Sequence, residues 1–151
     1  MGIFNFFKNL SLSKNDKLIA RWEKEHMEIA QCGIEAQDAQ IKGDSKKAKK
    51  NIKKMYELAI KHIKDEDDTF HHLKINSSKN DPKYNDIMQS IEEFEESFAP
   101  IKKALIQFLV IYAADRKLLD DEFKTKLSTI MGVLEERIDW EEKNLYKLLK
   151  D

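Results

Sequence analysis

The stretch KNDKLIARWEKEHMEIAQCGIEAQDAQIK, residues 14–42, decides the fold. Its apolar and small residues recur at alternating intervals of three and four, which places them on one face of an α-helix. The members of this face are Ile19, Trp22, His26, Ile29, Gly33 and Ala36. Most other positions are charged or carry amides, so the segment is predicted to be a long amphipathic helix that buries one side.

Three further segments repeat this spacing and are predicted to be helices of similar length. They cover residues 46–74, 83–114 and 121–150. The turn Gly43-Asp44-Ser45, the polar loop INSSKNDP and the linker DRKLLDD separate the four segments. Pro100 lies inside the third segment, where it is predicted to kink or split the helix.

Short connections between long helices favour antiparallel neighbours. The sequence therefore predicts an all-α fold, an up-down-up-down antiparallel four-helix bundle, over residues 14–151. A short apolar N-terminal arm, residues 1–13, precedes the bundle. A long coiled-coil dimer is the alternative, because the three-four spacing is sustained, but the breaks near residues 43, 78 and 118 argue against it.

The composition limits the class of protein. A chain of 151 residues with 41% hydrophobic residues suffices for one packed domain, and only 4 Gly and 2 Pro favour long helices. The formal net charge of −1 gives no basic field that would attract nucleic acid. The single cysteine, Cys32, allows neither an intramolecular disulfide nor a zinc site built from several thiolates.

No segment predicts a transmembrane helix or a secretory signal, so a cytoplasmic location is expected. The longest apolar run, residues 104–114, is too short to cross a bilayer. The apolar residues of the arm are Ile3, Phe4, Phe6 and Phe7. We interpret them as packing on the bundle, and a peripheral contact of the arm with a membrane or a partner is the alternative.

One pattern occurs twice, as HIKDE at residues 62–66 and as RIDWE at residues 137–141. In each copy a polar residue is followed by Ile, two variable residues and Glu. Positions four apart share a helix face, so His62 projects with Glu66, and Arg137 projects with Glu141. Both pairs fall on the apolar face of their own helix, where polar groups are costly to bury without partners. The repeat is therefore the best indication of function.

The helical rise of about 1.5 Å per residue predicts that these polar residues lie at one level of the antiparallel bundle. One layer of the core is predicted to contain His26, His62, Glu66, Glu95, Arg137 and Glu141. Imidazole and carboxylate groups on facing helices are how bundles hold iron or manganese, and a mixed nitrogen and oxygen set also suits zinc.

The segments WEKEH, residues 22–26, and HIKDE, residues 62–66, resemble the first half of a hemerythrin-like (HHE cation-binding) domain. RIDWEE, residues 137–142, is similar to the same motif in a degenerate second half. The resemblance implies a four-helix bundle with two non-haem irons that binds or senses dioxygen or another small gas, stores iron, or handles oxidative stress. By the same resemblance His26 and His62 are terminal ligands, Glu66 is a bridging carboxylate, and Glu141 or Glu142 is the second bridge.

The chain departs from that family pattern in its second half. Arg137, which has no acceptor atom, stands at a ligand position, and no histidine follows His72. One hypothesis is a reduced site with one metal ion, iron in the first place, on His26, His62, Glu66 and a carboxylate of the third or fourth helix, Glu95 or Glu141. The alternative is a metal-free adaptor that binds a partner protein, in which Arg137 pairs with Glu66 and Glu141 in place of the metal.

The sequence favours a binding protein over an enzyme. It contains no Gly-rich phosphate loop and no Ser-His-Asp set that can be placed in space. A carboxylate-rich oxidase would need a second metal ion and more ligands than the chain offers.

Overall fold

The computed structural model describes residues 14–76 and 82–150. The long helices in this part of the chain are α2 (Lys14–Ile41), α3 (Ser45–Asn76), α4 (Pro82–Ala113) and α5 (Asp121–Trp140). A π-helical turn, η1 (Glu141–Leu145), and a last short helix, α6 (Tyr146–Leu149), continue α5. The predicted N-terminal arm lies outside the described residues.

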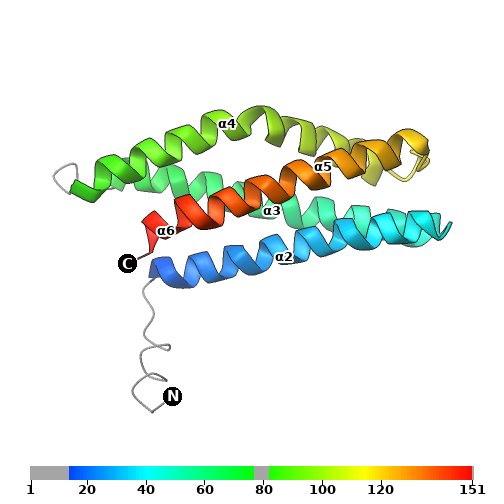
Figure 1. Cartoon of the computed structure of the whole chain (residues 1–151), viewed down its shortest axis with the longest axis horizontal. Coiled ribbons are helices and arrows are strands. Elements are labelled where there is room, and N and C mark those ends of the chain that lie inside the picture. The colour runs from blue at the N-terminus through cyan, green and yellow to red at the C-terminus, as the bar shows by residue number, and fades with distance from the viewer. Residues whose placement is uncertain (1–13, 77–81, 151) are drawn as a thin grey trace, which may run out of the picture.

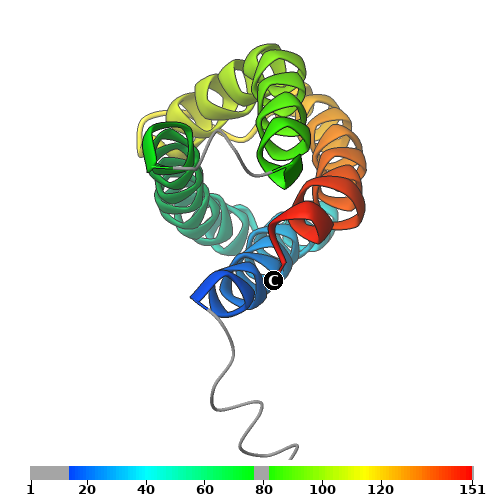
Figure 2. The same ribbon diagram turned by 90° about the vertical axis from the view of Figure 1, so that its left-hand side faces the viewer.

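The four long helices run alternately in opposite directions (Figure 1). Viewed from one end they surround a common axis, with α2 beside α3 and α5, and α4 closing the ring (Figure 2). The described residues contain no strand. The prediction of an all-α, up-down-up-down four-helix bundle is therefore confirmed.

Helix ends fall where the polar turns were expected. Gly43 follows α2 with a φ of 78°, a left-handed conformation that glycine adopts without strain. Asp44 Oδ1 then accepts a hydrogen bond from the backbone N–H of Lys47 at 3.0 Å at the start of α3. Asp120 caps α5 in the same way, accepting from the N–H of Phe123 at 2.8 Å.

Pro100 lies inside α4 and does not split it, because the helix continues from Pro82 to Ala113. The helix bends in its middle part (Figure 1). Pro100 is exposed, so the carbonyl that loses its hydrogen bond to the missing N–H can be reached by water.

The core is divided along its length into two apolar clusters. The hairpin-end cluster, near the α2–α3 turn, includes Ile29, Ile52, Met55, Leu109, Tyr112, Phe123 and Leu127. The chain-end cluster, near the start of α2 and α6, includes Ile19, Trp22, Phe70, Ile91, Phe94, Leu145 and Leu149. The buried polar residues described below lie between the two.

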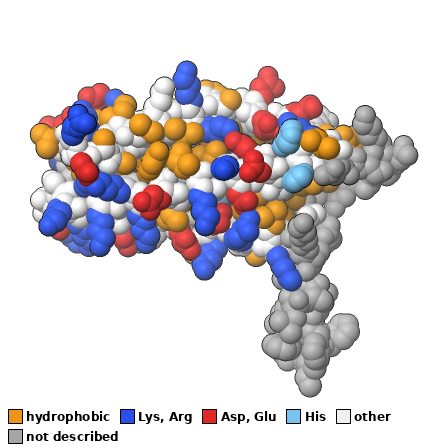
Figure 3. Space-filling view, turned by 180° about the vertical axis from the view of Figure 1, so that it is seen from behind, with side chains coloured by type: hydrophobic (Ala, Val, Ile, Leu, Met, Phe, Trp, Pro, Cys, Tyr) orange, Lys and Arg blue, Asp and Glu red, His pale blue; other side chains and the backbone are white. Residues whose placement is uncertain are grey.

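Charged side chains of both signs cover the outside of the bundle, and basic ones gather toward one end of the face in Figure 3. None of the helices in residues 14–76 and 82–150 has an apolar stretch long enough to span a membrane.

Candidate metal centre

Four buried side chains from three segments meet between the two apolar clusters. His26 comes from α2, His62 and Glu66 from α3, and Glu141 from η1. One ligand atom of each lies within 4.8 Å of the others, and each residue is 3–5% exposed. The structure thus brings together four of the five predicted metal ligands.

His62 is held by a carboxylate on its outer side. Its Nδ1 lies 2.8 Å from Glu25 Oε1, so Nδ1–H donates to Glu25 and the lone pair of the neutral ring is on Nε2. Nε2 lies 3.4 Å from Glu66 Oε2 and makes no hydrogen bond with a described residue. A buried lone pair next to a carboxylate oxygen is repelled by it unless a proton or a cation lies between them.

The pKa values of the two buried histidines are shifted in opposite directions. Burial, helped by the neighbouring His62, lowers the pKa of His26 to about 4. The pKa of His62 is raised, because the nearby carboxylates of Glu66 and Glu25 outweigh its burial, which alone would lower it. His26 is therefore neutral at neutral pH, with Nε2 located 3.6 Å from Glu141 Oε1.

The outer nitrogen of His26 has no firm partner. Nδ1 makes no hydrogen bond with a described residue and lies 3.8 Å from Glu142 Oε1. Glu142, which the resemblance offered as an alternative bridge, is thus on the outer side of His26 and outside the four-residue cluster.

Glu66 and Glu141 form a carboxylate pair that shares one proton. Burial, and then the charge of Glu66, raise the pKa of Glu141 well above its usual value. Burial also acts to raise the pKa of Glu66, but a hydrogen bond with Glu141, the nearby imidazole of His62 and the hydroxyl of Tyr146 lower it overall. Of the two carboxyl groups, Glu141 is therefore the one that holds the proton more strongly in the metal-free protein. A bound cation would take the place of this proton.

Tyr146 completes the cluster, although the sequence did not predict it. Its hydroxyl donates to Glu66 Oε2 at 2.6 Å, is also hydrogen-bonded to Glu141 Oε1, and lies 3.3 Å from His26 Nε2. Burial and the two carboxylates raise its pKa above the ordinary value, so the phenol stays protonated in the metal-free protein.

The π-helical turn explains why Tyr146 was missed. On an α-helix, residues five apart point about 140° away from each other, so Tyr146 was expected off the face of Glu141. The wider turn of η1 brings both to the interior. Beyond η1, Tyr146 and Leu149 are buried, whereas Leu148 between them is only half-buried.

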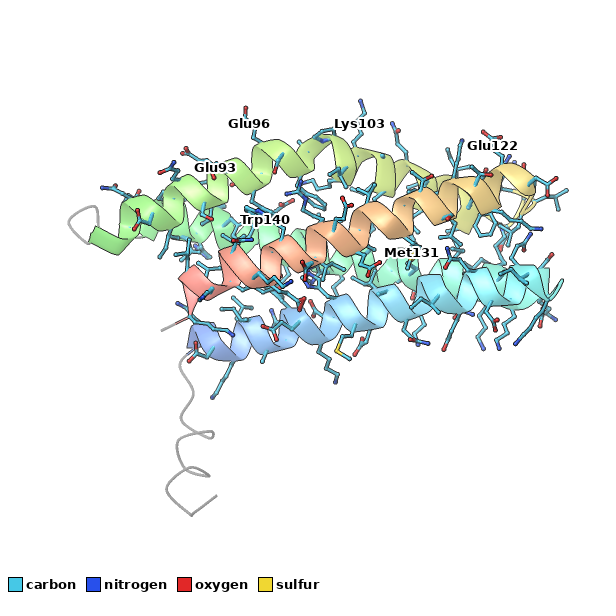
Figure 4. The ribbon with its side chains drawn as sticks, in the orientation of Figure 1. Glu93, Glu96, Lys103, Glu122, Met131 and Trp140 are labelled. Atoms are coloured by element: carbon cyan, nitrogen blue, oxygen red, sulfur yellow. The ribbon has the colours of Figure 1, made fainter. Side chains whose placement is uncertain are left out.

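The prediction that Arg137 pairs with Glu66 and Glu141 is wrong. Arg137 Nη1 donates to Ser97 Oγ at 3.0 Å, and the guanidinium lies 5.6 Å from the ring centre of Trp140 and 5.9 Å from that of Phe94. Trp140 lies on the side of α5 that faces α4 (Figure 4). The guanidinium stays hydrated on this partly exposed side, because full burial of its charge would cost free energy.

Glu95 does not join the cluster either. It forms an ion pair with Lys74 Nζ at 2.6 Å, and its side chain is 40% exposed. The level along the bundle was predicted well, but Phe94 and Phe98 occupy the inward positions of α4 at this height. Within the part of the chain that the structure describes, α4 contributes no side chain to the four-residue cluster.

Two outer carboxylates were also missed by the sequence argument. Glu25 stands directly before His26 in EKEH, and its contact to His62 follows from the direction in which α2 faces α3. Asp65 stands directly before Glu66 and accepts a hydrogen bond from Trp22 Nε1 at 2.8 Å. The adjacent acids in these two motifs were the available signal.

A cavity of about 30 Å³ adjoins the cluster. All four cluster residues line it, together with the apolar residues Ile29, Ala59, Ile63, Phe98, Leu105, Leu134 and Ile138, and with Arg137. This volume accommodates an ion or a molecule of one or two heavy atoms and excludes a large organic substrate.

Two imidazoles and two carboxylates that are buried and converge are a donor set that could hold a transition-metal ion. In comparisons with known proteins, no protein-family model matches the chain, and no curated protein and no solved structure matches it.

Proposed function

We propose that this protein binds one transition-metal ion, iron in the first place, between the two apolar clusters, as a hemerythrin-like protein with a reduced ligand set. The ligands are His26, His62, Glu66 and Glu141. The observation that carries the proposal is His62 Nε2, a buried atom that makes no hydrogen bond with a described residue and faces the other three ligands while Glu25 holds Nδ1. A carboxylate behind a metal-bound imidazole fixes its orientation and makes it a better donor.

The number of ions follows from the ligands that are missing. Glu95 and Arg137 lie outside the cluster, so the second half of the bundle adds one carboxylate and no histidine. Two imidazoles and two carboxylates suffice for one ion of iron, manganese or zinc. A second ion would share the same carboxylates and have no nitrogen donor.

The apolar wall of the adjoining cavity supports a small uncharged ligand on such an ion. Phe98, Leu105 and Leu134 line the 30 Å³ cavity beside the donors. Dioxygen or another diatomic gas is of this size and polarity, so we propose gas or redox sensing or carriage as the role of the ion.

A metal-free adaptor that binds a partner protein is the second candidate. It is favoured by the way the carboxylates are satisfied without a cation, through the shared proton and the Tyr146 hydroxyl. In that case the polar layer serves only the fold.

Metal analysis of protein purified without chelators or a metal-affinity column, after growth with added iron, separates the two candidates. We expect close to one iron per chain, loss of the iron in His62→Ala, and no change in His71→Ala. His71 is a suitable control because it is an exposed histidine of the same helix. Less than about a tenth of a metal ion per folded chain would refute the metal site and favour the adaptor.

A further inference from the structure

We propose that Tyr146 is a fifth metal ligand, and that its phenolate makes the site selective for Fe(III) over divalent ions such as Zn(II). This inference rests on the proposed metal site and adds its donor set and oxidation state. The Tyr146 oxygen is already among the ligand atoms, hydrogen-bonded to both carboxylates and 3.3 Å from His26 Nε2. A metal ion within reach of those three groups is also within reach of the phenol oxygen.

The Tyr146 ring is fixed in this position by its packing. The residue is fully buried. Its ring stacks on that of His26 with the ring centres 5.7 Å apart and an interplanar angle of 9°, and its ring centre lies 5.4 Å from that of Trp22. The turn η1 directly before it sets the direction of its side chain. The phenol oxygen is therefore held at the cluster before any metal arrives, so little conformational entropy is lost on binding.

The balance of charge decides which ion the phenol oxygen binds. When Fe(III) binds, the phenol O–H bond and the carboxyl O–H bond of Glu141 break, oxygen–metal bonds form, and both protons leave to water. Ionised Glu66, ionised Glu141 and the phenolate then carry three negative charges, which Fe(III) neutralises. A divalent ion is already neutralised by the two carboxylates. With Zn(II), ionising the phenol would leave a buried net negative charge, which is costly. Zn(II) therefore leaves Tyr146 protonated.

The competing explanation is that the hydroxyl blocks the site. Its hydrogen bonds to Glu66 and Glu141 would then stand in for the metal, and removing it would free the carboxylates for a cation. The two explanations predict opposite effects of Tyr146→Phe. If Tyr146 is a ligand, Fe(III) binding weakens in this variant. If it blocks the site, metal binding becomes tighter.

The test loads metal-free protein with Fe(III) as its nitrilotriacetate complex and, in parallel, with Zn(II). Phenolate bound to Fe(III) gives a charge-transfer absorption band in the visible, which imidazole and carboxylate ligands do not give. We expect this band in the unchanged protein and in Tyr112→Phe, a matched control that is equally buried and has its hydroxyl 3.5 Å from Asp120. We expect no band in Tyr146→Phe, with Fe(III) affinity about 10- to 100-fold lower and Zn(II) affinity unchanged.

The outcomes separate this inference from the proposed function. Iron bound without the band, or equal or tighter Fe(III) binding by Tyr146→Phe, overturns the role of Tyr146 and leaves the metal site standing. Binding of neither ion overturns both. If Tyr146→Phe fails to fold by circular dichroism, ring-fluorinated tyrosine in the unchanged protein replaces it. A band whose energy does not shift with fluorination then refutes a tyrosinate ligand.

Discussion

The two copies of the repeated pattern, HIKDE at residues 62–66 and RIDWE at residues 137–141, reach the same level of the bundle but arrange their side chains differently. Their glutamates behave alike, because Glu66 and Glu141 are both buried and both contact Tyr146. The first residues of the two copies point in different directions. His62 points into the cluster, whereas Arg137 lies outward over aromatic rings and bonds to Ser97.

This difference shows that sequence spacing predicts the position of a residue along the bundle axis better than it predicts the direction of its side chain. Level follows from the helical rise and is the same for both copies. The direction of the side chain depends on the free-energy cost of burying it. A carboxylate partner offsets this cost for an imidazole, whereas a guanidinium without such a partner stays near solvent. In the second copy the π-helical turn supplies Tyr146 instead, so the site is asymmetric.

The largest expected effect is the loss of metal binding when Glu66 or Glu141 is replaced. Comparing the two replacements tests whether both copies of the pattern supply an equivalent carboxylate ligand. Glu66→Gln and Glu141→Gln each remove one charge and one donor, so metal affinity is expected to fall about 100-fold or more in both. Isothermal titration with Fe(II) under nitrogen measures this, and Asp67→Asn, an exposed acid on the same helix, is the control. A loss confined to one variant would show that only one copy holds the ion.

The same two variants should differ in the stability of the metal-free protein. The pKa of Glu141 is raised well above its usual value, so an amide there resembles the protonated carboxyl group and should change the free energy of unfolding little. Glu66 is ionised, so Glu66→Gln also removes the charge that raises the pKa of His62. Denaturant unfolding at pH 7 should therefore rank Glu66→Gln below Glu141→Gln.

The fold could be predicted from the sequence because periodicity and helix breakers determine it together. The three-four spacing of residues 14–42 and the turn at Gly43 fix the length of the first helix, and similar lengths with short connections leave few arrangements. The level of His26, His62, Glu66 and Glu141 followed from counting residues. These inferences depend only on local geometry, which each segment carries in its own sequence.

Three features of the site could not be predicted, because each depends on packing between helices. Glu95 lies beside the apolar face of α4, and Phe94 and Phe98 take the inward positions. Arg137 had two ways to satisfy its charge, and only the position of Trp140 and Ser97 decides between them. Tyr146 lies in the cluster because of a π-helical turn, and no residue pattern in RIDWEEKNLYKLLK predicts that turn.

The second largest effect is a pH dependence of the metal-free protein that originates in His26. Its pKa is about 4 when folded and 6.5 when unfolded, so between these values the unfolded chain binds a proton that the folded chain does not. Stability from this group is present above pH 6.5 and is lost as pH falls toward 4, by about 3 kcal/mol in total. The raised pKa values of His62 and Glu141 act in the opposite direction, since the stability from each is lost as pH rises.

Comparison with His26→Gln isolates the histidine. Denaturant unfolding of both proteins between pH 4 and 7 gives two curves, and the difference between them should shrink steadily as pH falls. The opposing influences of His62 and Glu141 are present in both proteins and largely cancel. A difference that stays constant over this range would mean that His26 is protonated equally in the folded and unfolded chains.

A smaller effect is expected from the carboxylate that supports the first copy and has no counterpart in the second. Glu25→Gln leaves His62 in place but weakens the hydrogen bond to Nδ1, which orients the ring. Metal affinity should fall by about tenfold, and Glu28→Gln, an exposed residue on the same helix, should leave it unchanged. An unaltered affinity in Glu25→Gln would show that packing against Trp22 alone orients the imidazole.

The smallest effect is expected from Arg137→Met, the change that would be most harmful if the second copy buried its charge. An arginine that neutralised two buried carboxylates would cost about 3–5 kcal/mol on removal. Arg137 instead makes one hydrogen bond to Ser97 and stacks on Trp140 at a partly exposed position, so the loss should be about 1 kcal/mol or less. Chemical denaturation measures it, and metal affinity should stay the same. A cost of several kcal/mol would mean that the guanidinium reaches Glu66 and Glu141 in solution, and that the two copies are more alike than their side-chain directions indicate.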